Sequence, residues 1–227
     1  MCYGYIYYYQ YYYYYMTKYI IYLEGSISAG KSTLLPRISN ALKRMLCNTN
    51  IYEYPEQLNI WNDIKKCDKP ILQLLYDNPG QYATTFQYLT LITRQSQHME
   101  FLETKGEGIA IIERSYLSDR LFQNVMFSEG YINKLDMDIF KTAHIPTIKH
   151  IHLYVRTQPY ICYERIHLKR KRPEEQNINI LYLEKLHKMH EEVFMQDDMI
   201  CIDNNEEISE DNLNIVCEYI IQMLKCS

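Results

Sequence analysis

Short runs of apolar residues alternate along the chain with longer segments in which apolar residues recur every three or four positions. The short runs, at residues 19–23, 51–54, 108–112, 150–155 and 199–203, predict buried β-strands. The longer segments, at residues 30–46, 82–103, 118–127, 159–168, 180–195 and 211–225, predict helices. Strands that alternate with helices predict an α/β fold, in which helices cover both faces of a five-stranded parallel sheet.

The first 16 residues do not share this pattern, because most of them are Tyr. Such low complexity is not typical of a folded element. The segment lacks the basic start and cleavage site of a secretory signal, and it is poor in the Arg and Ser of a transit peptide. We expect residues 1–16 to be disordered, or not translated if Met16 is the working start, and residues 17–227 to form a single domain.

Composition narrows the class of protein further. The chain has 227 residues, 47% hydrophobic and 23% charged, which excludes a wholly disordered chain. A net charge of −4 argues against a nucleic-acid partner, and no run of 18 apolar residues indicates a membrane span. None of the seven cysteines forms a C-x-x-C pair, so neither a zinc site nor a disulfide framework is indicated. A reducing compartment, the cytoplasm, is the simplest expectation.

The segment GSISAGKS, residues 25–32, matches the phosphate-binding pattern G-x-x-x-x-G-K-[ST]. It lies between a predicted strand and a predicted helix, where backbone N–H groups and the helix N-terminus can surround phosphate oxygens. Lys31 can reach the β- and γ-phosphates, and the Ser32 hydroxyl can ligate Mg²⁺. Pro36 should kink the helix that follows. The predicted nucleotide-binding residues are Gly25, Ser26, Ile27, Ser28, Ala29, Gly30, Lys31, Ser32 and Thr33.

Two further motifs raise the alternative of a GTPase. Residues 77–80 are D-x-x-G and residues 133–136 are N-K-x-D, in the order of a small GTPase. The guanine-binding motif should end a buried strand, yet the preceding residues, SEGYI, contain no apolar run. The residues before Asp77, ILQLLY, have helical spacing, although a strand is also possible. A GTPase is therefore the minor alternative.

Several separated blocks resemble the deoxynucleoside kinase family, particularly the deoxycytidine and deoxyguanosine kinases. They are EGSISAGKST at residues 24–33, YPEQLNIW at 54–61, LLYDNP and TFQ within 74–87, ERSYLSDR at 113–120, and RKRPEEQ and YLEKLH within 170–187. The resemblance implies an ATP-dependent P-loop kinase with a helical lid. It would phosphorylate the 5′-hydroxyl of a deoxyribonucleoside in nucleotide salvage, and it would form a homodimer.

Three acidic and basic residues near strand ends carry the implied chemistry. A carboxylate can accept the proton of a sugar hydroxyl, and the resemblance assigns this role of general base to Glu56. It assigns phosphoryl-charge stabilisation to Arg114, together with Lys31, and Mg²⁺ binding to Glu113, together with Ser32.

The predicted long helix carries polar residues on one face. Gln87 and Arg94 are seven residues apart, nearly two turns, so they point the same way. The resemblance implies that Gln87 binds the base and that Arg94 pairs with Asp119. An acidic acceptor suits the amino group of cytosine or adenine, so we expect amino-bearing bases to be favoured over thymine. A thymidine-preferring or broad-range kinase, and a purely structural ion pair, stay open.

The remaining implied contacts are those of the sugar, the base face and the lid. Tyr76 and Glu175 match positions that hold the 3′-hydroxyl, and Phe86 matches one that packs on the base. Gln123 stands where the family often has Phe, which leaves the stacking partner open. The basic residues between 165 and 172 match the lid that closes over ATP. Arg165, Arg170 and Arg172 fit best, with the register inside residues 169–172 open.

Overall fold

The computed structural model describes residues 18–143, 148–195 and 199–226. The Tyr-rich segment of residues 1–16 and its proposed start at Met16 lie outside the described residues. Within the described part, no helix has the length and apolar character needed to cross a membrane.

The five predicted strands form one parallel sheet, with only small differences at their ends. They are β1 (Lys18–Glu24), β2 (Ile51–Tyr54), β5 (Gly108–Glu113), β6 (His150–Arg156) and β7 (Ile200–Asp203). Their order across the sheet is β2-β5-β1-β6-β7, and every neighbouring pair is parallel. The predicted α/β fold is therefore confirmed. Parallel order brings the carboxyl ends of all five strands to one edge, where ligands of such sheets bind.

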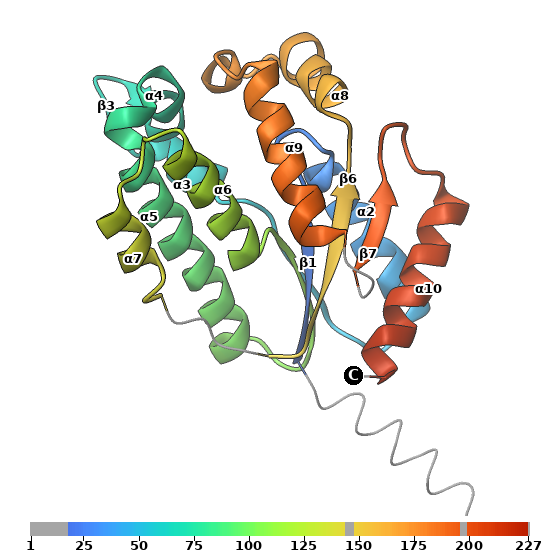
Figure 1. Cartoon of the computed structure of the whole chain (residues 1–227). Helices are drawn as coiled ribbons and strands as arrows, with labels where there is room; N and C mark the ends of the chain where they lie inside the picture. Colours follow the sequence, from blue (N-terminus) through green and yellow to red (C-terminus); the bar gives the residue numbers. More distant parts are fainter. Residues whose placement is uncertain (1–17, 144–147, 196–198, 227) are drawn as a thin grey trace, which may run out of the picture.

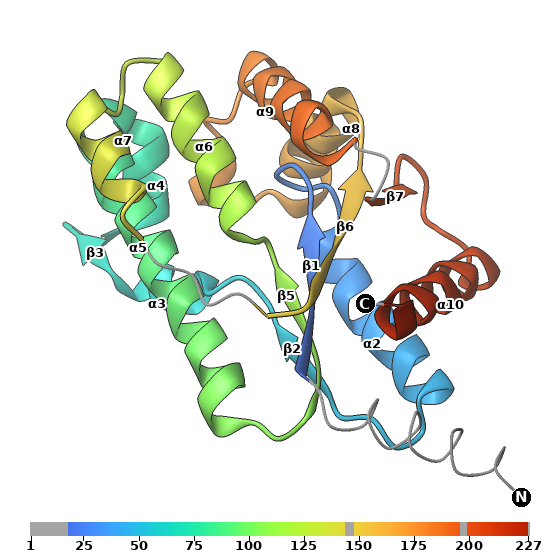
Figure 2. The same ribbon diagram turned by 60° about the horizontal axis from the view of Figure 1, so that its bottom comes forward.

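Helices cover both faces of this sheet (Figures 1 and 2). On one face lie α2 (Lys31–Met45) and α10 (Glu210–Cys226), and on the other lie α5 (Pro79–Met99), α6 (Tyr116–Ser128) and α9 (Ile180–Phe194). Side chains of a strand point to alternate faces. Ile21 and Leu23 accordingly belong to the core cluster that contains α2, whereas Ile20 and Tyr22 pack with Phe101, which follows α5.

Several short elements were not predicted. Beyond β2 the chain forms α3 (Leu58–Asp63), a hairpin of β3 (Lys65–Lys66) and β4 (Lys69–Pro70), and α4 (Ile71–Asp77). A further helix, α7 (Lys134–Phe140), follows α6. The π-helical turn η1 (Glu100–Thr104) continues α5. The lid region consists of α8 (Pro159–Glu164), the π-helical turn η2 (Arg165–Arg170) and the 3₁₀ turn η3 (Pro173–Glu175).

The proline in the first helix does not end it. Helix α2 continues through Pro36 for a further nine residues, up to Met45. Pro36 lacks the N–H that would bond to the carbonyl of Ser32, one turn earlier. The missing bond falls in the first turns of α2, directly after the phosphate loop.

The two GTPase-like motifs occupy helical positions. Asp77 is the last residue of α4, so the residues before it form a helix and not a strand. Asn133 is the N-cap of α7: its side chain accepts from the Asp136 N–H at 3.0 Å, and Asp136 Oδ2 accepts from the Asn133 N–H at 3.3 Å. This reciprocal capping box explains the N-K-x-D pattern as a helix start. The GTPase alternative loses both of its supporting motifs.

Candidate active site

The phosphate loop connects β1 to α2 at the carboxyl edge of the sheet. Gly25 and Gly30 have φ angles of 143° and 104°, which side chains rarely adopt. A Cβ atom at Gly30 would also lie 2.3 Å from Asn204 Nδ2, so the turn requires glycine there. Lys31 begins α2, and its Nζ donates to the carbonyl oxygens of Gly25 at 3.2 Å and Ser26 at 2.9 Å.

Carbonyl groups of the loop also accept hydrogen bonds from side chains outside it. The Ala29 oxygen accepts from Asn204 Nδ2 at 2.7 Å, Thr157 Oγ1 at 3.0 Å and Arg165 Nη1 at 3.1 Å. The Gly25 oxygen accepts from Arg114 Nη1 at 2.7 Å. Gly25, Ser26 and Ala29 therefore lie behind the cavity wall and hold the shape of the loop, whereas the other predicted loop residues line the cavity.

A cavity of about 500 Å³ extends from the phosphate loop across the carboxyl edge of the sheet. It collects residues from five predicted blocks that are far apart in the sequence. The predicted residues on its wall are Ile27, Ser28, Gly30, Lys31, Ser32, Thr33, Glu56, Tyr76, Phe86, Gln87, Arg94, Arg114, Asp119, Arg165, Arg170, Arg172 and Glu175. The volume is in the range of cavities that hold small-molecule ligands.

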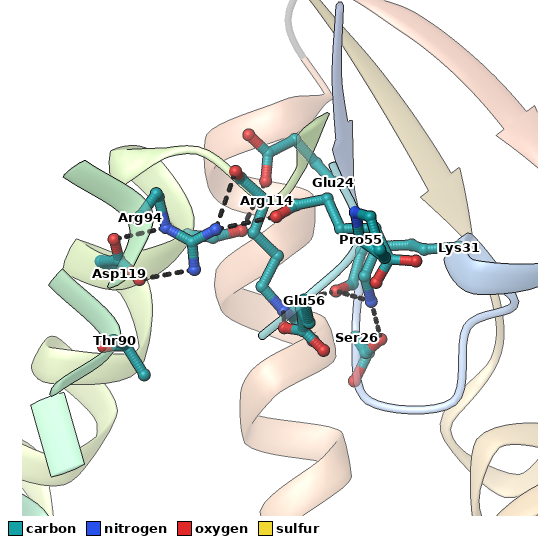
Figure 3. Close-up of polar contacts among 12 residues, drawn as sticks. Glu24, Ser26, Lys31, Pro55, Glu56, Thr90, Arg94, Arg114 and Asp119 are labelled. Carbon is teal, nitrogen blue, oxygen red and sulfur yellow. Dashed lines mark hydrogen bonds and ion pairs between the residues drawn. The ribbon is translucent and has the colours of Figure 1, made fainter. Parts of the chain in front are cut away.

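Arg114 connects Glu56, the predicted general base, to the phosphate loop (Figure 3). Its Nε donates to Glu56 Oε1 at 2.5 Å, while its Nη1 holds the Gly25 carbonyl. The guanidinium also lies 4.7 Å from the centre of the Phe122 ring, on whose face it stacks. Burial opposes ionisation of Glu56, but Arg114, Lys31 and Arg94 outweigh burial and hold the pKa of Glu56 well below its ordinary value.

Arg94 and Asp119 form a buried, bidentate ion pair at the other end of the cavity. Arg94 Nε and Nη2 donate to the two carboxylate oxygens of Asp119 at 2.7 and 3.0 Å. The third donor group, Nη1, contacts the backbone carbonyls of Glu113 and Arg114 at 2.7 and 3.0 Å. Nearby, the Oε1 atom of Gln87 is buried and has no hydrogen-bond partner. A buried amide oxygen without a partner is costly, which makes it a candidate contact for a ligand.

Tyr76 and Glu175 face the middle of the cavity from α4 and η3. Burial raises the pKa of both groups above their ordinary values. One oxygen of Glu175 lies 3.9 Å from Arg170 Nη2 and 3.7 Å from Arg172 Nη1, and the other has no partner. Glu175 thus pairs with two arginines of the same lid region and keeps one oxygen available to a ligand.

The lid residues approach the phosphate loop from η2. Arg170 Nη1 donates to Ser28 Oγ at 2.8 Å, and Arg165 Nη2 donates to the Asn204 carbonyl at 2.7 Å. Lys169 lines the cavity with the three predicted arginines, and Lys171, between them, does not. The cluster therefore places several positive charges around the space next to the loop, where a triphosphate would lie.

Ser32 and Glu113 suit a magnesium ion by the chemistry of their donor groups. Glu113 is buried at the end of β5, its carboxylate is within hydrogen-bonding reach of Ser32, and its Oε1 has no partner. Burial, together with the charge of Glu56, raises the pKa of Glu113. Hydroxyl and carboxylate oxygens are the ligands that Mg²⁺ prefers, and a cation here would relieve the cost of this buried group.

Sequence reasoning missed some residues of the wall. Phe122 lines the cavity, whereas Gln123 faces a separate cavity beyond α6, so the aromatic side chain of this helix lies one position earlier than the family pattern implies. Asn204 and Asn205 line the cavity beside Ala29. The sequence could have indicated them, because they directly follow the last predicted strand, at the edge of the sheet where ligands bind. Thr90, on the same face as Gln87 and Arg94, could have been found from helical spacing.

Comparison with known proteins agrees with this geometry. The family model described as deoxynucleoside kinase matches residues 21–223. Deoxycytidine kinase 2 of Gallus gallus is 29% identical over an alignment of 244 positions, gaps included, which covers 90% of this chain and 88% of that protein. The mitochondrial deoxyguanosine kinase of Xenopus laevis is 30% identical, covering 74% of this chain and 70% of its own. A probable deoxycytidine kinase of fowlpox virus is 34% identical, covering 75% and 69%. The chain therefore belongs to the deoxynucleoside kinase family, whose members are ATP-dependent phosphotransferases.

Proposed function

We propose that this enzyme transfers the γ-phosphoryl group of ATP to the 5′-hydroxyl of a deoxyribonucleoside, as a step of nucleotide salvage. We also propose that it favours deoxycytidine, deoxyadenosine and deoxyguanosine over thymidine. One observation carries the first proposal: Glu56 and the phosphate loop face the same cavity and are joined through the guanidinium of Arg114. The proposed proton acceptor, Glu56, and the proposed triphosphate site, the loop, thus contact the same arginine side chain.

In the proposed reaction the 5′-oxygen bonds to the γ-phosphorus, the bond to the β–γ bridging oxygen breaks, and ADP leaves. Glu56 takes the hydroxyl proton. Its lowered pKa keeps it ionised at neutral pH, so it is ready to accept a hydrogen bond from the hydroxyl. Because this carboxylate is only weakly basic, it takes the proton late in the reaction, when the new P–O bond has made the hydroxyl strongly acidic. Before that, the main role of Glu56 is to orient the hydroxyl.

The positive groups stabilise charge on the phosphoryl group as it moves. Lys31 and Arg114 reach the cavity from the loop and from the end of β5, and the lid arginines Arg165, Arg170 and Arg172 line the same cavity. Mg²⁺, when bound, neutralises charge on the phosphate oxygens, and Ser32 and Glu113 are the residues that would hold it. Closure of the lid would exclude water and limit hydrolysis of ATP.

The proposed base preference depends on the Arg94–Asp119 ion pair and on the amide of Gln87. Gln87 has an unpartnered oxygen that can accept from an amino group, and Asp119 supplies acceptor oxygens nearby. Thymine offers a carbonyl where cytosine and adenine carry the amino group, so its carbonyl would meet acceptors. Guanine is included because it has an exocyclic amino group, on C2, which thymine lacks. Tyr76 and Glu175 are proposed to hold the 3′-hydroxyl, and Phe86, which packs edge-on against Trp61, is proposed to contact the base.

A homodimer and a cytoplasmic location complete the proposal. Helices α5 and α7 lie side by side through the Thr84–Asp136 hydrogen bond and the Tyr88–Phe140 ring contact. Beside these contacts, Ile92 and Leu135 expose 62% and 69% of their surfaces, which supports association through these helices. The cysteines at positions 47, 67, 162, 201 and 217 are free, which suits a reducing compartment.

The direct test is incubation of the purified protein with Mg-ATP and each deoxynucleoside separately, with 5′-monophosphate formation measured by chromatography. We expect monophosphate from deoxycytidine, deoxyadenosine or deoxyguanosine at a higher kcat/KM than from thymidine. A higher value for thymidine, or equal values for all four, would reject the base preference and leave the kinase. Absence of monophosphate from every deoxynucleoside, with GTP hydrolysis in a parallel incubation with GTP alone, would reject the reaction itself.

The base-recognition residues are tested by the double variant Arg94→Met with Asp119→Ala. Removal of the pair should shift preference towards thymidine. Because Arg94 also holds two backbone carbonyls next to Arg114, we expect kcat for every nucleoside to fall as well. An unchanged ratio of kcat/KM values would mean that the pair only supports the structure.

A further inference from the structure

Arg114 adopts a backbone conformation that an arginine rarely occupies. Its φ angle is 65°, in the left-handed region. Such a conformation persists only where surrounding contacts hold it. It turns the chain sharply between β5 and α6, and it directs the guanidinium towards Glu56 and the Gly25 carbonyl.

The peptide groups on both sides of Arg114 are held by hydrogen bonds. The Arg114 N–H donates to the Leu23 carbonyl at 2.9 Å, and the Arg114 carbonyl accepts from Arg94 Nη1 at 3.0 Å. The next N–H, that of Ser115, donates to Glu24 Oε1 at 3.2 Å. The acceptor in this last contact, Glu24, lies before the phosphate loop and does not line the cavity.

Glu24 ends β1 and is completely buried. Besides the Ser115 N–H, it accepts from the Ser118 hydroxyl at 2.5 Å and from His152 Nδ1 at 3.0 Å. Burial opposes its ionisation, but these donors outweigh it and bring the pKa of Glu24 to about 2. The carboxylate is therefore charged and receives three hydrogen bonds, from β6 on one side and from the start of α6 on the other.

These contacts are more than the cap of a helix. The Ser115 Oγ already caps α6 by accepting from the Leu117 N–H at 3.0 Å. Glu24 instead fixes the position of the first turn of α6 relative to β1, whose next residue is Gly25 of the phosphate loop. One buried carboxylate thus links the end of β1 to the start of α6, the two segments on either side of Arg114.

We propose that Glu24 is a positioning residue for phosphoryl transfer, which holds Arg114 in its left-handed conformation and thereby aligns its guanidinium with Glu56 and the transferred phosphoryl group. His152 acts with it by orienting the carboxylate. The inference rests on the proposed function for its kinetic consequence, but the effect of Glu24 on the geometry of Arg114 does not depend on that function.

The test is the variant Glu24→Gln, which keeps the shape of the side chain and removes its charge. An amide has one acceptor oxygen and cannot receive all three hydrogen bonds. We expect kcat to fall by about 10- to 100-fold, as for a small misplacement of a catalytic group, while KM for ATP and nucleoside changes by less than about 3-fold. Ser118→Ala, which removes one donor and is safer for folding, should show a smaller fall in kcat.

Two controls separate positioning from general damage. Glu53→Gln removes a carboxylate that also accepts from a serine, Ser39, but lies on β2 away from this turn, and it should leave kcat unchanged. In the Arg114→Lys background, Glu24→Gln should have little further effect on kcat, because both changes act through one group. Losses that multiply in the double variant, or a kcat for Glu24→Gln within about 2-fold of the parent enzyme, would overturn the inference.

A crystal structure of Glu24→Gln gives a result that is independent of activity. We expect Arg114 to leave the left-handed region or its Nε to lose contact with Glu56. If the backbone and guanidinium of Arg114 stay in place, Glu24 does not position them, whatever the kinetics show. If the parent enzyme forms no monophosphate, the proposed function fails, while this structural comparison still decides the role of Glu24.

Discussion

Lys31 has a buried ammonium group which, among the described residues, donates to the backbone carbonyls of Gly25 and Ser26 and to no carboxylate. Burial, followed by the charge of Arg114, lowers the pKa of Lys31 to about 8. The charged form exists below that pKa and binds phosphate. Hence kcat/KM for ATP should decrease as pH rises through about 8, whereas Glu56 should produce no acid limb between about pH 5 and 7.

A pH–rate profile measures this directly, with Lys31→Arg as the matched control. The guanidinium does not titrate in the accessible range, so any residual activity of Lys31→Arg should show no alkaline limb from this position. A profile of the parent enzyme that stays flat to about pH 9.5 would contradict the lowered pKa of the free enzyme.

At the residue scale, the sequence predicted which side chains would line one cavity better than it predicted which residues hold the loop in shape. Glu56, Gln87, Arg94 and Asp119 all line the cavity, because motif and helical spacing constrain their faces. Motif matching does not distinguish loop residues that contact a ligand from those that hold the loop, such as Ala29, whose carbonyl is used by three protein donors. The second role of Arg94, at the Glu113 and Arg114 carbonyls, depends on tertiary contacts that no local pattern encodes.

At the scale of elements, the capping box of α7 has a measurable consequence. Asn133→Ala removes the acceptor for the Asp136 N–H and should lower the free energy of unfolding by about 1 kcal/mol. The melting temperature should fall by about 2–4 °C with kcat unchanged, because neither residue lines the cavity. Asn133→Asp, which keeps an acceptor oxygen, should restore most of the loss.

A different outcome would change the interpretation of the N-K-x-D motif. If Asn133→Ala abolished nucleotide binding while stability stayed unchanged, the residues would form a binding motif and not a helix start. Differential scanning calorimetry together with a nucleotide-binding measurement distinguishes the two cases.

The long elements were predictable and the short ones were not. The central strands β1 and β5 are buried on both faces because helices cover both, so their apolar runs stand out in the sequence. The outer strands β2 and β7 each carry exposed residues. Elements α3, α4 and α7 have six or seven residues, fewer than two full turns, and α3 buries only Trp61. Periodicity cannot be read over so few residues. The change from the α-helical turns of α8 to the π-helical turn η2 at Arg165 likewise left no signal in the sequence.

At the scale of the whole molecule, the cavity joins the sheet edge, α5, α6 and the lid, so a ligand that fills it contacts elements from most of the chain. A nucleoside or ATP at about 100 times its dissociation constant should raise the free energy of unfolding by about 2.7 kcal/mol. For a domain of this size the melting temperature should rise by about 5–10 °C. No rise with either ligand at saturation would contradict a binding cavity at this position.

The proposed reaction depends most on the carboxylate of Glu56, whose oxygen contacts Arg114 beside the phosphate loop. The most direct measurement is the turnover of Glu56→Gln with Mg-ATP and the preferred deoxynucleoside, together with the nucleoside dissociation constant. We expect kcat to fall by about 10²- to 10⁴-fold, with the melting temperature and nucleoside binding close to those of the parent enzyme. A kcat within a few-fold of the parent value would remove Glu56 as the proton acceptor and contradict the account.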